Sequence, residues 1–161
     1  MKNPNELREA AETIPLDDID RRLITELQRD GRASFADLGP LIGLSAAATR
    51  QRVQRLTTSG VVQVVGVTDP LALGYPVMAA LGIGVSGDVR SIADAIADIE
   101  GVIYVVLTSG SFDLLVEVLA GDSAALLGMI NDEVRAINGV RSVESFIYFG
   151  IHTHRFAWAP R

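Results

Sequence analysis

The sequence predicts an α+β protein, with an N-terminal trihelical (winged) helix-turn-helix unit followed by a ferredoxin-like βαββαβ domain. Three observations carry this prediction. Apolar residues recur at helical spacing through residues 16–60, and after Gly60 the pattern changes to β-branched runs and a strand–helix alternation. The charge divides as well: residues 43–68 hold three arginines and no acid, whereas residues 86–139 hold nine acids and two arginines. This asymmetry indicates two modules with different partners.

The bulk composition narrows the class of protein. The chain has 161 residues, of which 48% are hydrophobic and 21% charged, so it can bury a core. No apolar run reaches the ~18 residues of a membrane helix, and the first residues lack the apolar stretch of a signal peptide. The absence of cysteine excludes disulfides and thiolate metal sites. We therefore expect a cytoplasmic, nucleoid-associated protein with no membrane partner.

Three helices are expected in the first module, after a loose extension over residues 1–15. The first spans residues 16–30, where apolar side chains form one stripe, acids favour the start and Gly31 marks the stop. Ser34 caps a second helix that ends at Gly43, and Pro40 is expected to kink or shorten it. Ser45 caps a third helix that runs to about Ser59 and stops at Gly60. We place this helix-turn-helix domain at residues 16–60.

The third helix carries the strongest signal for DNA binding. Its core side is formed by Thr49, Val53 and Leu56, while small residues at its start allow close approach to a partner. Arginine and glutamine further along can reach base edges or phosphates, and the free N–H groups after Ser45 suit a phosphate. The predicted DNA-binding residues are Ser45, Ala47, Arg50, Gln51, Arg52, Gln54 and Arg55. Two alternatives stay open: the arginines form an ordinary solvated face, or Arg52 pairs with Asp17 or Asp20 and serves the fold.

The second half begins with a linker, residues 61–76, in which the valines of residues 61–67 predict a strand. Residues 77–161 form the second domain. Its strands are expected at 77–85, 102–107, 112–119 and 140–151, with helices over 89–99 and 126–137. In this order both helices cover the same face of a four-stranded sheet. The other face, which we expect to be rich in Val, Ile and Leu, predicts self-association.

Several motifs, in their order and spacing, resemble the Lrp/AsnC (feast/famine) transcriptional regulators. The resemblance covers residues 16–156 and rests on residues 16–20, 27–32, 43–45, 52–56, 60–62, 109–115 and 138–140. It implies a DNA-binding helix-turn-helix and an effector domain, called RAM, that dimerises by its sheet. It also implies assembly of dimers into tetramers or octamers, and amino acids as effectors.

The resemblance places the effector between dimers, near the turn at 109–113 and the last strand. The implied residues are Ser109, Gly110, Ser111, Asp113 and Ser145. The chemistry is suitable, because backbone N–H groups at Gly110 can hold a carboxylate and Asp113 can pair with an ammonium group. The alternative is that Gly110 only makes the hairpin and Asp113 only caps its turn.

Other functions have weaker support. Siroheme decarboxylases share this fold, but they use histidines in the second domain, and here only His152 and His154 occur, at the C-terminal end. Those two residues alternate along a strand, yet two ligands are too few for a metal site within one chain. We expect no enzyme activity, no metal and no cofactor. An architectural DNA-binding protein that needs no effector remains the main alternative.

Overall fold

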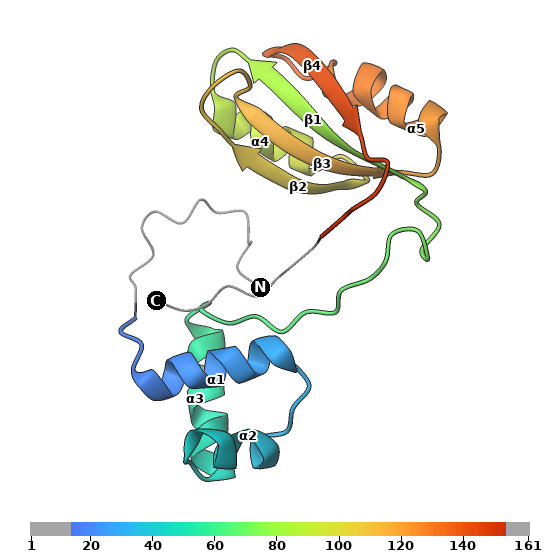
Figure 1. Cartoon of the computed structure of the whole chain (residues 1–161). Helices are drawn as coiled ribbons and strands as arrows, with labels where there is room; N and C mark the ends of the chain where they lie inside the picture. Colours follow the sequence, from blue (N-terminus) through green and yellow to red (C-terminus); the bar gives the residue numbers. More distant parts are fainter. Residues whose placement is uncertain (1–13, 154–161) are drawn as a thin grey trace. The chain divides into compact units, whose positions relative to one another are not determined.

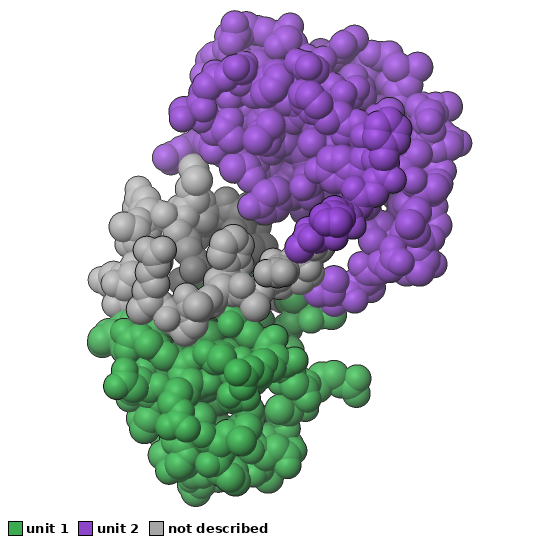
Figure 2. Space-filling model, in the orientation of Figure 1, with its two compact units in different colours: residues 1–66, 154–161 green, residues 67–153 purple. Residues whose placement is uncertain are grey.

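The computed structural model describes residues 14–153, which form two compact units (Figure 1). The units divide between Gly66 and Val67, as the two colours of Figure 2 show. Most of the predicted extension over residues 1–15 lies outside the described residues, and so does His154. Each unit has its own hydrophobic core, and each is described separately below.

Unit 1 contains the three predicted helices: α1 (Asp18–Arg29), α2 (Phe35–Ile42) and α3 (Ala46–Thr58). Each begins at a side-chain cap that satisfies a free backbone N–H. Asp17 and Asp20 form a reciprocal capping box on α1. The Ser34 side chain accepts from Asp37 N on α2, and Ser45 accepts from Ala48 N on α3. Both serine caps predicted from the sequence are confirmed.

The turn between α2 and α3 depends on two glycines. Gly43 ends α2 with φ 75°, a left-handed conformation that favours glycine. A Cβ on Gly39 would lie 2.6 Å from Leu44 O, so only glycine lets the backbone close there. Pro40 stands inside the eight-residue helix α2 without ending it. The core beneath consists of Leu23, Ile24, Leu38, Ile42 and Leu56.

The predicted strand at residues 61–67 is wrong for this chain. The segment has no regular secondary structure, and Val64, Val65 and Val67 are each more than half exposed. A strand needs a partner for its ladder of hydrogen bonds, and no segment among residues 14–153 pairs with these valines. For the same reason, a wing after α3 is not present within the described residues.

Unit 2 is a four-stranded antiparallel sheet of β1 (Val77–Val85), β2 (Val102–Leu107), β3 (Leu114–Ala120) and β4 (Val140–Ile147), in the order β2-β3-β1-β4. The helices are α4 (Val89–Ala97) and α5 (Ser123–Gly128), the latter continued by a π-helical segment, η1 (Met129–Val134). The predicted βαββαβ order is confirmed. The last strand is shorter than expected, since it ends at Ile147 and not at residue 151.

The helices pack against one face of this sheet (Figure 1). Cross-strand partners share a face, so the register identifies the residues on either side. Leu81, Ile83 and Val116 point to the helices and are fully buried.

The opposite sheet face is apolar, as predicted, and it carries aromatic as well as aliphatic side chains. Phe112 and Phe146 meet edge to face, with ring centroids 6.2 Å apart. Gly82 makes room for the Phe112 ring, which lies where a Cβ would be. The other large side chains of this face, deduced from the register, are Met78, Tyr104, Val106, Leu115, Glu117, Leu119, Glu144 and Tyr148. We call this surface the open sheet face.

Candidate functional site

The exposed side of α3 is the first candidate site. Thr49 and Leu56 are buried and Val53 is half-buried, which confirms the predicted core side of this helix. Arg50, Gln51 and Gln54 are exposed, and none of their side chains has a hydrogen bond or ion pair to another described residue. Ser45 and Ala47 at the helix start are also exposed. These groups are therefore available to a partner molecule.

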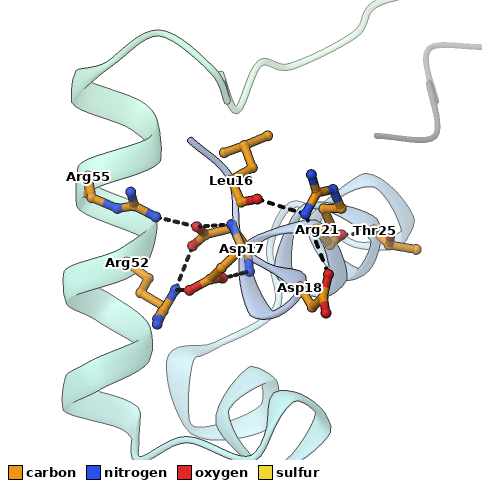
Figure 3. A network of polar contacts seen from close by, with 8 residues as sticks. Leu16, Asp17, Asp18, Arg21, Thr25, Arg52 and Arg55 are labelled. Atoms are coloured by element: carbon orange, nitrogen blue, oxygen red, sulfur yellow. Dashed lines mark hydrogen bonds and ion pairs between the residues drawn. The ribbon is translucent and has the colours of Figure 1, made fainter. Parts of the chain in front are cut away.

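Two of the predicted DNA-binding arginines are instead engaged within unit 1. In Figure 3, Arg52 and Arg55 extend from α3 toward the start of α1. Arg52 Nη1 lies 2.7 Å from Asp17 Oδ2 and 2.8 Å from Asp20 Oδ1. Arg55 pairs with the other carboxylate oxygen of Asp20. The ion pair considered for Arg52 thus forms with both aspartates.

The Asp20 carboxylate is the centre of this network, because its side chain is only 1% exposed. Burial raises the pKa of Asp20, but hydrogen bonds from Arg55 and Arg52 outweigh that effect and bring the pKa to about 2. The backbone N–H of Asp20, and then Arg52, lower the pKa of Asp17. Asp17 and then Asp20 raise the pKa of Arg52. The charged forms are thereby favoured, and α3 is fixed against α1.

Two of these exposed side chains, Arg50 and Gln54, border a hollow of about 400 Å³. Its lining residues are Phe35, Arg50, Val53, Gln54, Thr57 and Thr58. Sequence reasoning singled out Arg50 and Gln54 but missed Phe35, which is partly exposed at the start of α2. A mixed apolar and hydrogen-bonding surface of this kind can contact both a thymine methyl group and polar base edges.

The second candidate site is the turn between β2 and β3. Ser109, Gly110 and Ser111 are exposed, and Gly110 has φ 131° with open space around it. Hydrogen bonds from Thr108 N to Asp113 O (2.9 Å) and from Thr108 Oγ1 to Phe112 O (2.7 Å) close the turn. These hydrogen bonds hold the two ends of the turn together, while its exposed backbone groups face solvent.

Asp113 already has partners within the chain. Its Oδ2 accepts a hydrogen bond from Val85 N at 2.7 Å and lies 3.4 Å from Arg141 Nη2. Arg141 Nε in turn donates to Val85 O at 2.7 Å. The Asp113 side chain therefore holds the end of β1, and it remains 43% exposed. Arg141 therefore supplies this carboxylate with a cationic neighbour within the chain.

The structure does not bring Ser145 to the turn within one chain. Ser145 is exposed on β4 and faces Leu81 of β1, and β1 separates β4 from the β2–β3 hairpin. Arg141 is the β4 residue that reaches Asp113, and sequence reasoning missed it. The sequence did offer one indication of Arg141, which is one of the few arginines in an acidic domain.

Neither a metal centre nor a membrane helix is found among residues 14–153. No group of three or more histidine, aspartate or glutamate side chains could hold a metal ion there. His152 is exposed, and His154 lies outside the described residues. No helix of the described chain is long and apolar enough to cross a membrane.

Comparisons with known proteins agree with both units. Residues 16–57 match the AsnC-type helix-turn-helix domain, and residues 78–157 match the Lrp/AsnC ligand-binding domain. The chain is 30% identical over 141 residues to the HTH-type transcriptional regulator FL11 of Pyrococcus horikoshii, covering 86% of this chain and 93% of FL11. It is 33% identical over 135 residues to the HTH-type transcriptional regulator Rv2324 of Mycobacterium tuberculosis, covering 82% of this chain and 90% of Rv2324.

Solved structures share the arrangement within the units. The feast or famine regulatory protein Rv3291c of M. tuberculosis, complexed with L-methionine, superposes with a TM-score of 0.83 at 29% identity, covering 91% of this chain and all of that one. Escherichia coli AsnC superposes with a TM-score of 0.81, with the same coverage, and at 22% identity it supports the fold alone. Family domains match most of the chain, and the relatives extend over nearly its whole length. The protein belongs to the Lrp/AsnC family of DNA-binding transcriptional regulators.

Proposed function

We propose that this regulator binds double-stranded DNA in a sequence-specific way through α3, and that an amino acid controls this binding. The observation that carries the proposal is the exposed row of Arg50, Gln51 and Gln54, which have no partner among the described residues. Arginine and glutamine suit guanine and adenine edges in the major groove. Ser45 and Ala47 at the helix start leave its backbone N–H groups open to a phosphate.

Arg52 and Arg55 have a different role in this proposal. Their guanidinium groups hold α3 against α1 through Asp20, so they orient the reading helix. The Arg55 side chain is 44% exposed, and its remaining N–H groups suit a phosphate contact.

The proposed effector is a small zwitterion that binds at the turn of residues 109–113. Gly110 permits close approach of the ligand, and the half-exposed Asp113 carboxylate suits an ammonium group. Ser109 and Ser111 add exposed hydroxyl groups. Because Ser145 lies away from this turn within one chain, its contribution requires a second copy of the protein. The L-methionine complex of the related Rv3291c supports an amino acid as ligand.

The proposed functional unit is a homodimer formed through the open sheet face, with further assembly to tetramers or octamers. A single helix-turn-helix binds weakly, whereas two copies engage two half-sites. No enzyme activity and no cofactor enter this proposal. A regulator that binds the chromosome acts in the cytoplasm, and the absence of cysteine is compatible with that location.

The DNA contacts are tested by gel shift and footprinting on the promoter region of the protein's own gene. Arg50→Ala combined with Gln54→Ala should weaken specific binding by roughly 1–3 kcal/mol for each lost base contact. The control is Arg29→Ala, which removes an exposed arginine of α1 that pairs with Glu26. Unchanged footprints and affinity in the double variant would refute the assignment. Specific binding that no amino acid alters would instead indicate an architectural, effector-independent regulator.

A further inference from the structure

A second hollow, of about 460 Å³, lies in unit 2 where β4 begins. Its lining residues are Arg135, Val140, Arg141, Ser142 and Val143. Residues 67–153 contain eleven carboxylates but only three arginines and no lysine. Two of those three line this one hollow, and no carboxylate lines it. A concentration of positive charge in an acidic domain indicates a site for an anionic group.

The backbone places Arg135 at the hollow in an unusual way. Residues Met129–Val134 form the π-helical segment η1, and Arg135 N donates to Ile130 O, five residues earlier, at 3.0 Å. π-Helical turns are rare and recur at functional sites. The Arg135 side chain is oriented by Asn131, whose Oδ1 lies 3.0 Å from Arg135 Nη1. Because Asn131 is neutral, this hydrogen bond does not neutralise the charge of the guanidinium group.

The other arginine of the hollow, Arg141, contacts Asp113 in the turn of residues 109–113. Arg141 Nη2 and Asp113 Oδ2 lie 3.4 Å apart, with side chains 62% and 43% exposed. The backbone of Val85 holds both, because its N–H donates to Asp113 and its carbonyl accepts from Arg141. An α-amino acid carries an ammonium and a carboxylate on one carbon. The fixed pair therefore presents opposite charges to both groups of such a ligand.

We propose that the hollow selects an amino acid with an acidic side chain. Asp113 and Arg141 bind the α-ammonium and α-carboxylate groups, and Arg135 binds the side-chain carboxylate. Ser142, which also lines the hollow, offers a hydroxyl donor to the same group. The inference rests on the proposed function, in which an amino acid is the effector. It adds that aspartate or glutamate is preferred over neutral and basic amino acids.

Calorimetry on the full chain tests this preference. The ligands are L-aspartate, L-glutamate, L-asparagine, L-glutamine, L-methionine, L-lysine and sodium sulfate. At least one acidic amino acid should bind about tenfold or more tightly than its amide, because a charged hydrogen bond is lost in the amide. Arg135→Gln should abolish this difference. Arg90→Gln, which changes the third arginine of residues 67–153, should leave the difference intact.

The outcomes separate the two proposals. Equal affinity for the acids and their amides, or a preference that survives Arg135→Gln, would overturn the inference and leave an amino-acid effector in place. Sulfate that competes as well as the preferred acid would also overturn it, because the hollow would then bind any oxyanion. Binding of none of the amino acids would count against the proposed effector itself.

Discussion

At the scale of single residues, the arginines of α3 divide into two sets. Arg50 is exposed and unengaged among the described residues, whereas Arg52 and Arg55, three positions apart on one side of the helix, meet Asp20. The sequence suggested the pairing of Arg52 because Arg52 lies beside the core stripe. The sequence did not suggest that Arg55 pairs with Asp20, because that contact depends on how α1 crosses α3. Composition alone cannot distinguish an arginine that binds DNA from one that orients the helix.

This division predicts different effects for two matched substitutions. Arg50→Ala should weaken DNA binding and leave the free energy of unfolding within about 0.5 kcal/mol of the wild type, as is usual for an exposed residue. Arg55→Ala should lower the free energy of unfolding by more than about 1 kcal/mol, because Asp20 loses a partner while buried. Urea denaturation and gel shifts on both variants check this. Equal stability of the two variants would contradict the orienting role of Arg55.

Asp20 should also make the stability of unit 1 sensitive to acid. Its pKa is about 2 in the folded chain, against an ordinary value of 3.8. A depressed folded pKa contributes stability that is complete above the unfolded pKa and is lost as the pH falls through the folded value. The window therefore runs from about pH 4 down to about pH 2, and the contribution is up to about 2 kcal/mol.

The substitution Asp20→Asn should remove this acid dependence and destabilise the protein at pH 7. Asp18→Asn is the matched control, because the Asp18 side chain is 99% exposed at the start of the same helix. Urea midpoints measured between pH 2 and pH 7 give the comparison. If the slope with pH between 4 and 2 is the same in the wild type and in Asp20→Asn, Asp20 does not carry the effect.

At the scale of elements, prediction succeeded where local chemistry decides. Ser34 and Ser45 cap their helices because the hydroxyl and the N–H it satisfies are three residues apart. The βαββαβ order follows from the period of apolar residues, and β1 and β2 have the expected bounds.

Prediction failed where a distant partner decides. The valines of residues 61–67 have strand propensity but no strand beside them among the described residues. The register of β4 against β1 shifts between Gly84 and Val85, next to the backbone that holds Arg141 and Asp113. A bulge of this kind re-aims side chains, and the sequence pattern does not show it. The contact between Arg141 and Asp113 could therefore not be predicted.

The turn between α2 and α3 provides a test at this scale. Gly39→Ala places a methyl group 2.6 Å from the Leu44 carbonyl, which is backbone and cannot turn aside. We expect a loss of roughly 1–3 kcal/mol in stability, with weaker DNA binding because the turn sets the start of α3. Gly66→Ala, which meets open space, is the control. A Gly39→Ala variant as stable as the wild type would show that this turn relaxes without cost.

At the scale of the whole molecule, the open sheet face is the surface through which we propose that two copies of the chain associate. Leu115 is 41% exposed, Phe146 44% and Tyr104 60%, although all three belong to one continuous sheet surface. Glu117 lies among them and accepts a hydrogen bond from the Tyr148 hydroxyl at 3.0 Å. Its charge is thus partly satisfied within the chain, which lowers the cost of covering it. The other acid of this face, Glu144, lies on the edge strand β4. An apolar face whose acid on the inner strand β3 is already hydrogen-bonded is suited to a second copy of itself.

We therefore expect a dimer or a larger even-numbered assembly at micromolar concentration, and this face should control it. Leu115→Lys should weaken self-association by roughly 30-fold or more, as expected for a charge placed in the centre of an apolar interface. Leu127→Lys is the matched control, because Leu127 is 59% exposed on α5, on the helix side of the sheet. Light scattering across a concentration series measures the change, with circular dichroism to verify the fold. A monomeric wild type, or a Leu115→Lys variant that assembles as the wild type does, would show that this face is not the interface.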